Sequence, residues 1–142
     1  MNAHSPPHSI REAVLEDAPK WLALAVQRYP DRDVGGMRAW VEWCITNPDR
    51  LVLVGRASVG IAAVSLNYGV ERRGRMDVLY TIPHLKPGLE AFAMIEIMMR
   101  WAKQKGAQGP FYIEPDTDVD FGPFVQRLGG TPAGGVRYEI PY

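Results

Sequence analysis

Apolar residues recur with helical spacing in several segments of this chain. A first helix is expected over 16–29, where it ends before Pro30, and a second after Asp33, whose side chain is suited to cap it. A longer helix over 88–105 has so wide an apolar arc that burial against a sheet is expected. A short helix over 121–128 follows near the end of the chain.

Strand-like runs separate these helices. The apolar runs 51–54 and 59–68 are joined by a short turn and are expected to pair as a hairpin. A polar loop containing three arginines is predicted over 69–75, and the strand 76–82 after it runs into a Pro/Gly loop before the long helix. Further short strands are expected at 10–14, 111–113 and 136–140.

Composition narrows the class of protein without identifying it. The 142 residues suit one domain, which we expect over 10–142 after a flexible lead-in over 1–9. Lys and Arg together number 16, as do Asp and Glu, so nucleic acid is not expected as the main partner. No apolar run suggests a membrane span, and we predict a cytoplasmic location. No metal site is predicted, and Cys44 on an apolar helix face is interpreted as a buried hydrophobic residue.

The order of these elements, together with three local motifs, resembles the GNAT-type N-acyltransferases over nearly the whole chain. The motifs are Ile10-Arg11-Glu12-Ala13-Val14-Leu15-Glu16-Asp17-Ala18, Thr81-Ile82-Pro83 and Phe124-Val125-Gln126-Arg127-Leu128-Gly129-Gly130. The resemblance implies an α+β fold of three layers. Its central mixed, mostly antiparallel sheet would have about six strands and would be flanked by about four helices.

The resemblance also implies acetyl-CoA as co-substrate. In that family the pantetheine arm pairs with the central strand, and the pyrophosphate rests on amides at the start of the long helix, where free N–H groups and the helix dipole favour an anion. The implied strand contacts are Leu79, Tyr80, Thr81 and Ile82. The implied pyrophosphate contacts are Lys86, Pro87, Gly88, Leu89, Glu90 and Ala91.

The loop before the long helix departs from the family pattern, which has glycine where this chain has Leu89. Pro87 lacks an N–H donor, and Glu90 adds a negative charge beside the expected anion. The tyrosine that many members use to protonate the leaving thiolate is replaced by Val125. Candidate catalytic residues are therefore sought elsewhere. They are Asp77 and Tyr80 on the central strand and Glu114 after the next strand.

Two functions remain open at this point. The first is an acetyl-CoA-dependent N-acetyltransferase acting on a small-molecule or protein amine, in which orientation supplies much of the acceleration. The second is an inactive GNAT-like module that binds a protein partner or itself, such as those of some bacteriophage particles, where the location would be the virion. The degenerate loop favours the module, whereas the fold is compatible with both.

Overall fold

The computed structural model describes residues 9–67, 71–81 and 89–113. In chain order the described elements are β1 (Arg11–Glu12), the 3-10 turn η2 (Leu15–Asp17), α1 (Ala18–Arg28), α2 (Val34–Thr46), β2 (Arg50–Val54), β3 (Ser58–Asn67), β4 (Glu71–Thr81), α3 (Leu89–Gln104) and β5 (Tyr112–Ile113). Apart from Ser9, the predicted lead-in lies outside the described residues, as do the late helix and the last strand. None of the helices in the described ranges has the length and apolar character of a membrane span.

The strands form one mixed sheet in the order β1-β2-β3-β4-β5. The first four strands are antiparallel neighbours, and β2 and β3 form the predicted hairpin. β5 is parallel to β4, with Arg75 opposite Tyr112 and Met76 opposite Ile113. The predicted α+β class with a mixed, mostly antiparallel sheet is thereby confirmed.

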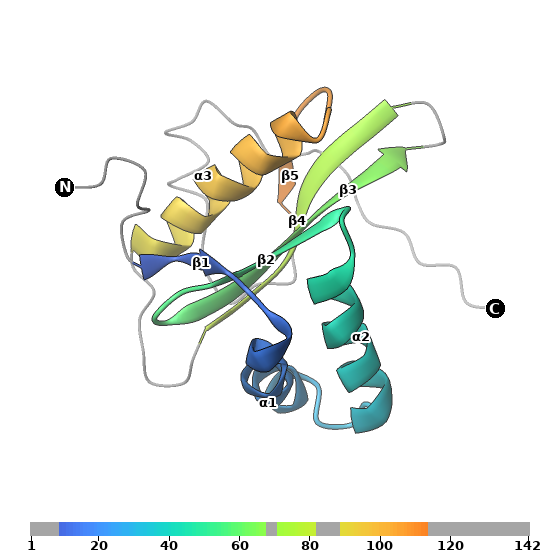
Figure 1. Ribbon diagram of the computed structural model, residues 1–142, viewed down its shortest axis with the longest axis vertical. Coiled ribbons are helices and arrows are strands. Elements are labelled where there is room, and N and C mark those ends of the chain that lie inside the picture. The colour runs from blue at the N-terminus through green and yellow to red at the C-terminus, as the bar shows by residue number, and fades with distance from the viewer. Residues whose placement is uncertain (1–8, 68–70, 82–88, 114–142) are drawn as a thin grey trace.

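Two helical layers enclose this sheet. Figure 1 shows α1 and α2 side by side on one face and α3 crossing the other. We name these the α1/α2 face and the α3 face. Each has its own buried apolar cluster, with Trp21, Ile61 and Val78 in the first and Met76, Leu79 and Met94 in the second. The three-layer prediction is confirmed.

Local signals in the sequence account for the helix ends. Asp33 caps α2, because its Oδ2 accepts a hydrogen bond of 2.7 Å from the N–H of Gly36.

Cys44 is fully buried, as predicted, and burial raises the pKa of its thiol to about 11. The methionine-rich α3 places Met94 and Met98 in the core, so packing accounts for both residues.

The predicted loop over 69–75 is wrong in its described part, because β4 already begins at Glu71. Arg72 and Arg73 pair in register with Leu66 and Ser65 of β3. Their charges are matched by carboxylates, Arg72 by Asp49 and Arg73 by Glu71. A run of charges suggested a solvated turn, whereas these side chains lie along a sheet where each finds an acidic partner.

A β-bulge interrupts β4 at Asp77. Ile61 of β3 is opposite Val78 and Ala62 is opposite Met76, which leaves Asp77 as the extra residue on β4. A bulge places two successive residues toward one face. Val78 belongs to the buried cluster of the α1/α2 face. Asp77 accepts a hydrogen bond from Arg50, which precedes Val52 of that cluster by two residues on β2 and therefore shares its face of the sheet. The bulge therefore turns Asp77 toward the α1/α2 face.

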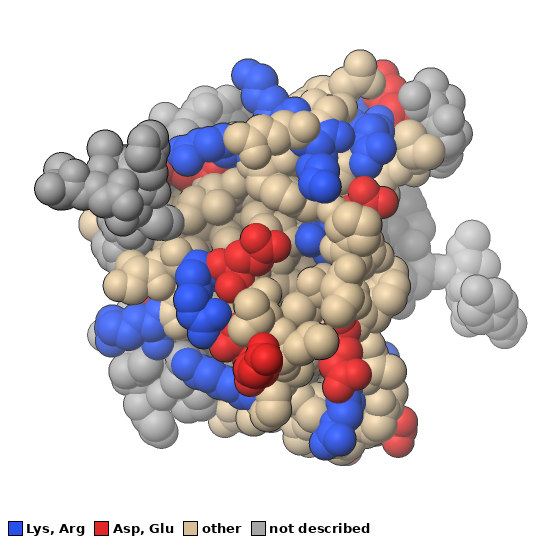
Figure 2. Space-filling view, viewed as in Figure 1, with Lys and Arg blue, Asp and Glu red and all other residues tan. Residues whose placement is uncertain are grey.

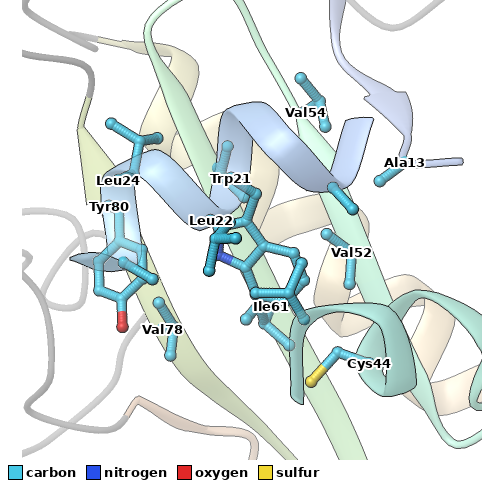
Figure 3. Packing of buried hydrophobic residues seen from close by; sticks show 14 residues of the cluster. Ala13, Trp21, Leu22, Leu24, Cys44, Val52, Val54, Ile61, Val78 and Tyr80 are labelled. Carbon is cyan, nitrogen blue, oxygen red and sulfur yellow. The ribbon is translucent and has the colours of Figure 1, made fainter. Parts of the chain in front are cut away.

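The core of the α1/α2 face is centred on an aromatic residue of α1. Figure 3 shows the indole of Trp21 between α1 and Ile61 of the sheet, with Val78 and Tyr80 of β4 beside it. Trp21 is 1% exposed, and its ring is 5.3 Å from that of Trp40 on α2. Packing at this point holds both helices against β4 and shapes the neighbouring cavity.

Candidate functional site

A cavity of about 490 Å³ lies on the α1/α2 face, against the second half of β4. The consecutive helices α1 and α2, their connection and the distant strand β4 form its wall. Its lining residues are Ala25, Tyr29, Arg32, Asp33, Gly36, Met37, Trp40, Val78 and Tyr80. The size lies in the range of small-molecule sites.

Aromatic rings and two opposite charges define the chemistry of this cavity. Tyr29 just after α1, Trp40 on α2 and Tyr80 on β4 contribute rings, and the rings of Tyr29 and Tyr80 meet edge to face at 6.4 Å. The Arg32 guanidinium lies 5.5 Å from the centre of the Tyr29 ring, so this wall already accepts a cation. Arg32 and Asp33 both line the cavity, so it holds one positive and one negative side chain beside the aromatic rings.

Tyr80 is the only one of the three predicted catalytic residues that the described structure places at this cavity. It is 4% exposed and lies on β4, three residues beyond the bulge. Asp77 does not line the cavity, and Glu114 lies outside the described residues. The catalytic roles of both residues stay predictions from the sequence.

Asp77 is held between two arginines. Its Oδ2 accepts a hydrogen bond of 2.7 Å from Arg50, and its Oδ1 accepts one of 2.5 Å from the Nε of Arg75. The Asp77 side chain is 17% exposed. Both oxygens therefore have cationic donors, and this ion-pair network gives Asp77 a structural role whether or not it has a second one.

Glu90 occupies the first turn of α3, within the predicted pyrophosphate contacts. Its side chain is turned into the β2–β3 hairpin, where it accepts hydrogen bonds from the N–H of Arg56 at 2.6 Å, the N–H of Ala57 at 3.0 Å and the hydroxyl of Ser58 at 2.7 Å. Glu90 is 3% exposed. Its carboxylate therefore has three internal donors, and its assignment to the pyrophosphate contacts stays a prediction.

The remaining predicted cofactor contacts divide between the end of β4 and the start of α3. Leu79 is buried on the α3 face and Thr81 is half-buried at the strand end. Ala91 is buried in the first turn of α3, whereas Leu89 is exposed. Ile82, Lys86, Pro87 and Gly88 lie outside the described residues. The assignment of these residues to a cofactor stays a prediction.

Sequence reasoning missed most of the cavity. Tyr29, Met37 and Trp40 were interpreted only as apolar helix faces, and Asp33 only as a cap. One signal pointed further: Tyr29 and Asp33 flank the α1–α2 connection, where aromatic and acidic residues converge. Their proximity to Tyr80 depends on how the helices pack on β4.

The chain has the fold of the GNAT-type acetyltransferases. The aminoglycoside antibiotic 6'-N-acetyltransferase AAC(6')-Ih from Acinetobacter baumannii superposes with a TM-score of 0.72 at 19% identity, covering 94% of this chain and 97% of that one. The resemblance predicted from the sequence is therefore confirmed at the level of the fold.

Two further solved structures extend the comparison. AAC(6')-Iy in complex with a bisubstrate analogue, CoA-S-monomethyl-acetylneamine, has a TM-score of 0.68 at 15% identity, covering 94% of this chain and 97% of that one. A ribosomal-protein-alanine N-acetyltransferase from Brucella melitensis biovar Abortus 2308 has a TM-score of 0.63 at 15% identity, with 94% and 99% coverage.

By sequence, neither a protein-family model nor a curated protein matches this chain. The similarity is therefore one of fold, carried by the order and packing of elements at identities of 15% to 19%.

Proposed function

We propose that this chain is an acetyl-CoA-dependent N-acetyltransferase whose acceptor amine binds in the cavity between α1, α2 and β4. The observation that supports this most is the cavity itself, with three aromatic rings and Asp33 beside the strand that carries Tyr80. The similar solved structures include acetyltransferases of small amines and of a ribosomal protein, and one holds a CoA-derived bisubstrate analogue.

The described residues at the start of α3 are compatible with the negatively charged pyrophosphate of acetyl-CoA. An anion at the start of α3 is favoured by the helix dipole, and the carboxylate that would oppose it, Glu90, is turned into the hairpin. Leu79, Tyr80 and Thr81 at the strand end, with Leu89 and Ala91 at the helix start, would hold the co-substrate. Bound acetyl-CoA supplies an activated thioester acetyl group.

The protein contributes orientation and proton handling. The aromatic rings and Asp33 attract the ammonium form of the acceptor and fix its position against β4. The amine must lose a proton before its lone pair can attack the thioester carbonyl. The hydroxyl of Tyr80 is the proposed group at the cavity wall that handles this proton or stabilises the leaving thiolate.

The test has two stages. Calorimetry with acetyl-CoA should show micromolar binding, and a panel of small amines should then release free thiol from acetyl-CoA in the presence of the protein. Tyr80→Phe should lower turnover about 100-fold with unchanged acetyl-CoA affinity, because only the hydroxyl is lost. Tyr112→Phe, on β5 and away from the cavity, is the matched control and should keep its turnover.

Three outcomes would contradict this proposal or part of it. The absence of binding heat at millimolar acetyl-CoA would overturn the proposed enzymatic function. It would favour the alternative, an inactive module that binds a protein partner or itself. Binding of acetyl-CoA with equal turnover in Tyr80→Phe and wild type would remove Tyr80 from the mechanism. Loss of acetyl-CoA affinity in Tyr80→Phe would show a binding role instead of a chemical one.

A further inference from the structure

A second cavity lies on the α1/α2 face, at the opposite end of β4. It has a volume of about 360 Å³ and is formed where α2 ends, β2 begins, β3 ends and β4 begins. Its lining residues are Trp43, Asn47, Asp49, Arg50, Ala63, Val64, Ser65, Leu66, Arg72 and Arg75. We name it the arginine cavity.

Positive charge exceeds negative charge around the arginine cavity. Arg50 and Arg75 share the single carboxylate of Asp77, and Arg72 pairs with Asp49 at 3.2 Å. Three guanidinium groups thus meet two carboxylates, which leaves one positive charge unmatched among the described residues. The side chains of Arg50 and Arg75 are only 17% and 30% exposed, so solvent screens this excess less than it would at an open surface.

The two inner guanidinium groups are held in fixed orientations. Arg75 donates from Nε to Asp77 and from Nη1 to the hydroxyl of Ser65 at 2.7 Å. Arg50 donates from Nη1 to Asp77 and lies over the Trp43 ring, 4.6 Å from its centre. These contacts use only part of each donor set, and a pre-ordered guanidinium loses little entropy when it binds an anion.

The cavity also offers an apolar wall. Trp43 and Leu66 both line the cavity and are 47% and 61% exposed. Figure 2 shows basic side chains, with acidic ones among them, gathered at the end of the molecule where β3 ends and β4 begins. A bound molecule could therefore direct an acidic group at the arginines and rest an apolar part on Trp43.

We propose that the arginine cavity binds the carboxylate or phosphate group of a small molecule that also carries an apolar or aromatic part. Guanidinium groups bind both anions through paired N–H donors, and a flat ring suits the Trp43 side. Arg75 precedes Tyr80 by five residues, which is about 16 Å along a strand. The arginine cavity is therefore separate from the proposed amine site, and its occupancy does not require acetyl transfer.

The full chain labelled with ¹⁵N should be titrated separately with sodium phosphate, sodium benzoate and sodium acetate, using sodium chloride at matched ionic strength as reference. We expect saturable shifts of the Trp43 indole N–H and of the amides of residues 63–66. The indole N–H of Trp40, in the other cavity, should stay unshifted. Tighter binding of benzoate than of acetate would show that the apolar wall contributes, and equal binding would remove that part of the proposal.

Ser65→Asp is the decisive variant, because a carboxylate beside Arg75 neutralises the excess charge while every arginine is kept. It should weaken phosphate and benzoate binding by at least about tenfold. Ser65→Asn is the matched control: it is polar but uncharged, and should bind nearly as wild type does. Thermal unfolding confirms that both variants fold.

Two results would overturn the proposal. The first is the absence of saturable shifts with phosphate and benzoate in the wild-type chain. The second is equal binding by Ser65→Asp and Ser65→Asn. Neither result depends on whether the chain acetylates an amine.

Discussion

The two faces of the sheet each hold a carboxylate that is largely removed from water, and they do so by different means. On the α3 face, Glu90 accepts hydrogen bonds from two backbone N–H groups and one hydroxyl, and none of these donors carries a charge. On the α1/α2 face, Asp77 accepts hydrogen bonds from two guanidinium groups. The first arrangement keeps a net negative charge and the second produces a net positive one.

The surroundings of the two carboxylates differ in how much space and how many unused donors they leave for a ligand. The Glu90 carboxylate packs closely against the hairpin turn, since a Cβ added to Gly55 would lie 2.6 Å from it. Its hydrogen bonds tie the start of α3 to the β2–β3 hairpin. The Asp77 network leaves donors and charge beside an open cavity. Glu90 thus serves to hold α3 on the hairpin, whereas the Asp77 network adjoins one of the two cavities described on the α1/α2 face.

The largest effect is expected from Glu90→Ala. Its loss leaves two N–H groups and a hydroxyl buried without their acceptor, and should lower the free energy of unfolding by about 3 kcal/mol. Ser58→Ala removes one donor together with its need for a partner and should cost about 1 kcal/mol. Urea denaturation measures both. A Glu90→Ala variant as stable as Ser58→Ala would show that the hairpin does not depend on this carboxylate.

Asp77→Asn should have an intermediate effect, about 2 kcal/mol, because two half-buried guanidinium groups lose their shared anion. Adding Arg75→Gln should cost less than the two single changes together, since one of the unmatched cations then disappears. Strict additivity in urea denaturation would contradict the shared-anion network. Turnover of Asp77→Asn, measured as thiol release, also tests the catalytic role predicted from the sequence: an unchanged rate would exclude it.

The smallest effect is expected at an ion pair with one partner largely in solvent, because Arg11 is 56% exposed although Asp17 is only 14% exposed. Arg11 binds Asp17 at 2.7 Å, and this hydrogen bond lowers the pKa of Asp17 from 3.8 to about 2. Asp17→Asn should cost no more than about 1 kcal/mol at neutral pH.

The pH dependence of the Arg11–Asp17 pair follows from the direction of the pKa shift of Asp17. Because the folded pKa lies below the ordinary value, the stabilisation is present above about pH 4 and is lost as the pH falls toward 2. Unfolding curves of wild type and Asp17→Asn should therefore converge over that interval. A constant difference between them down to pH 2 would contradict the pairing.

Local sequence signals predicted the elements and their faces. Asp33 as a helix cap, Cys44 as a core residue and the hairpin of β2 and β3 all follow from contacts between near neighbours or from simple periodicity. The same reasoning failed over 71–75, where charge suggested a loop, because the acidic partners that stabilise a strand there could not be seen. For the candidate sites, Tyr80 is the one predicted residue among those in the described ranges that lines either cavity.

The sequence by itself determined the order of helices and strands and the resemblance to the acetyltransferase fold, because both depend on residues close together along the chain. The tertiary structure decided where the chemistry lies. Asp77 meets Arg50 across 27 residues, and Glu90 meets Arg56 across 34. The bulge that turns Asp77 toward Arg50 is a matter of register between strands, which no local pattern encodes. Both cavities exist because packing on β4 brings such distant side chains together.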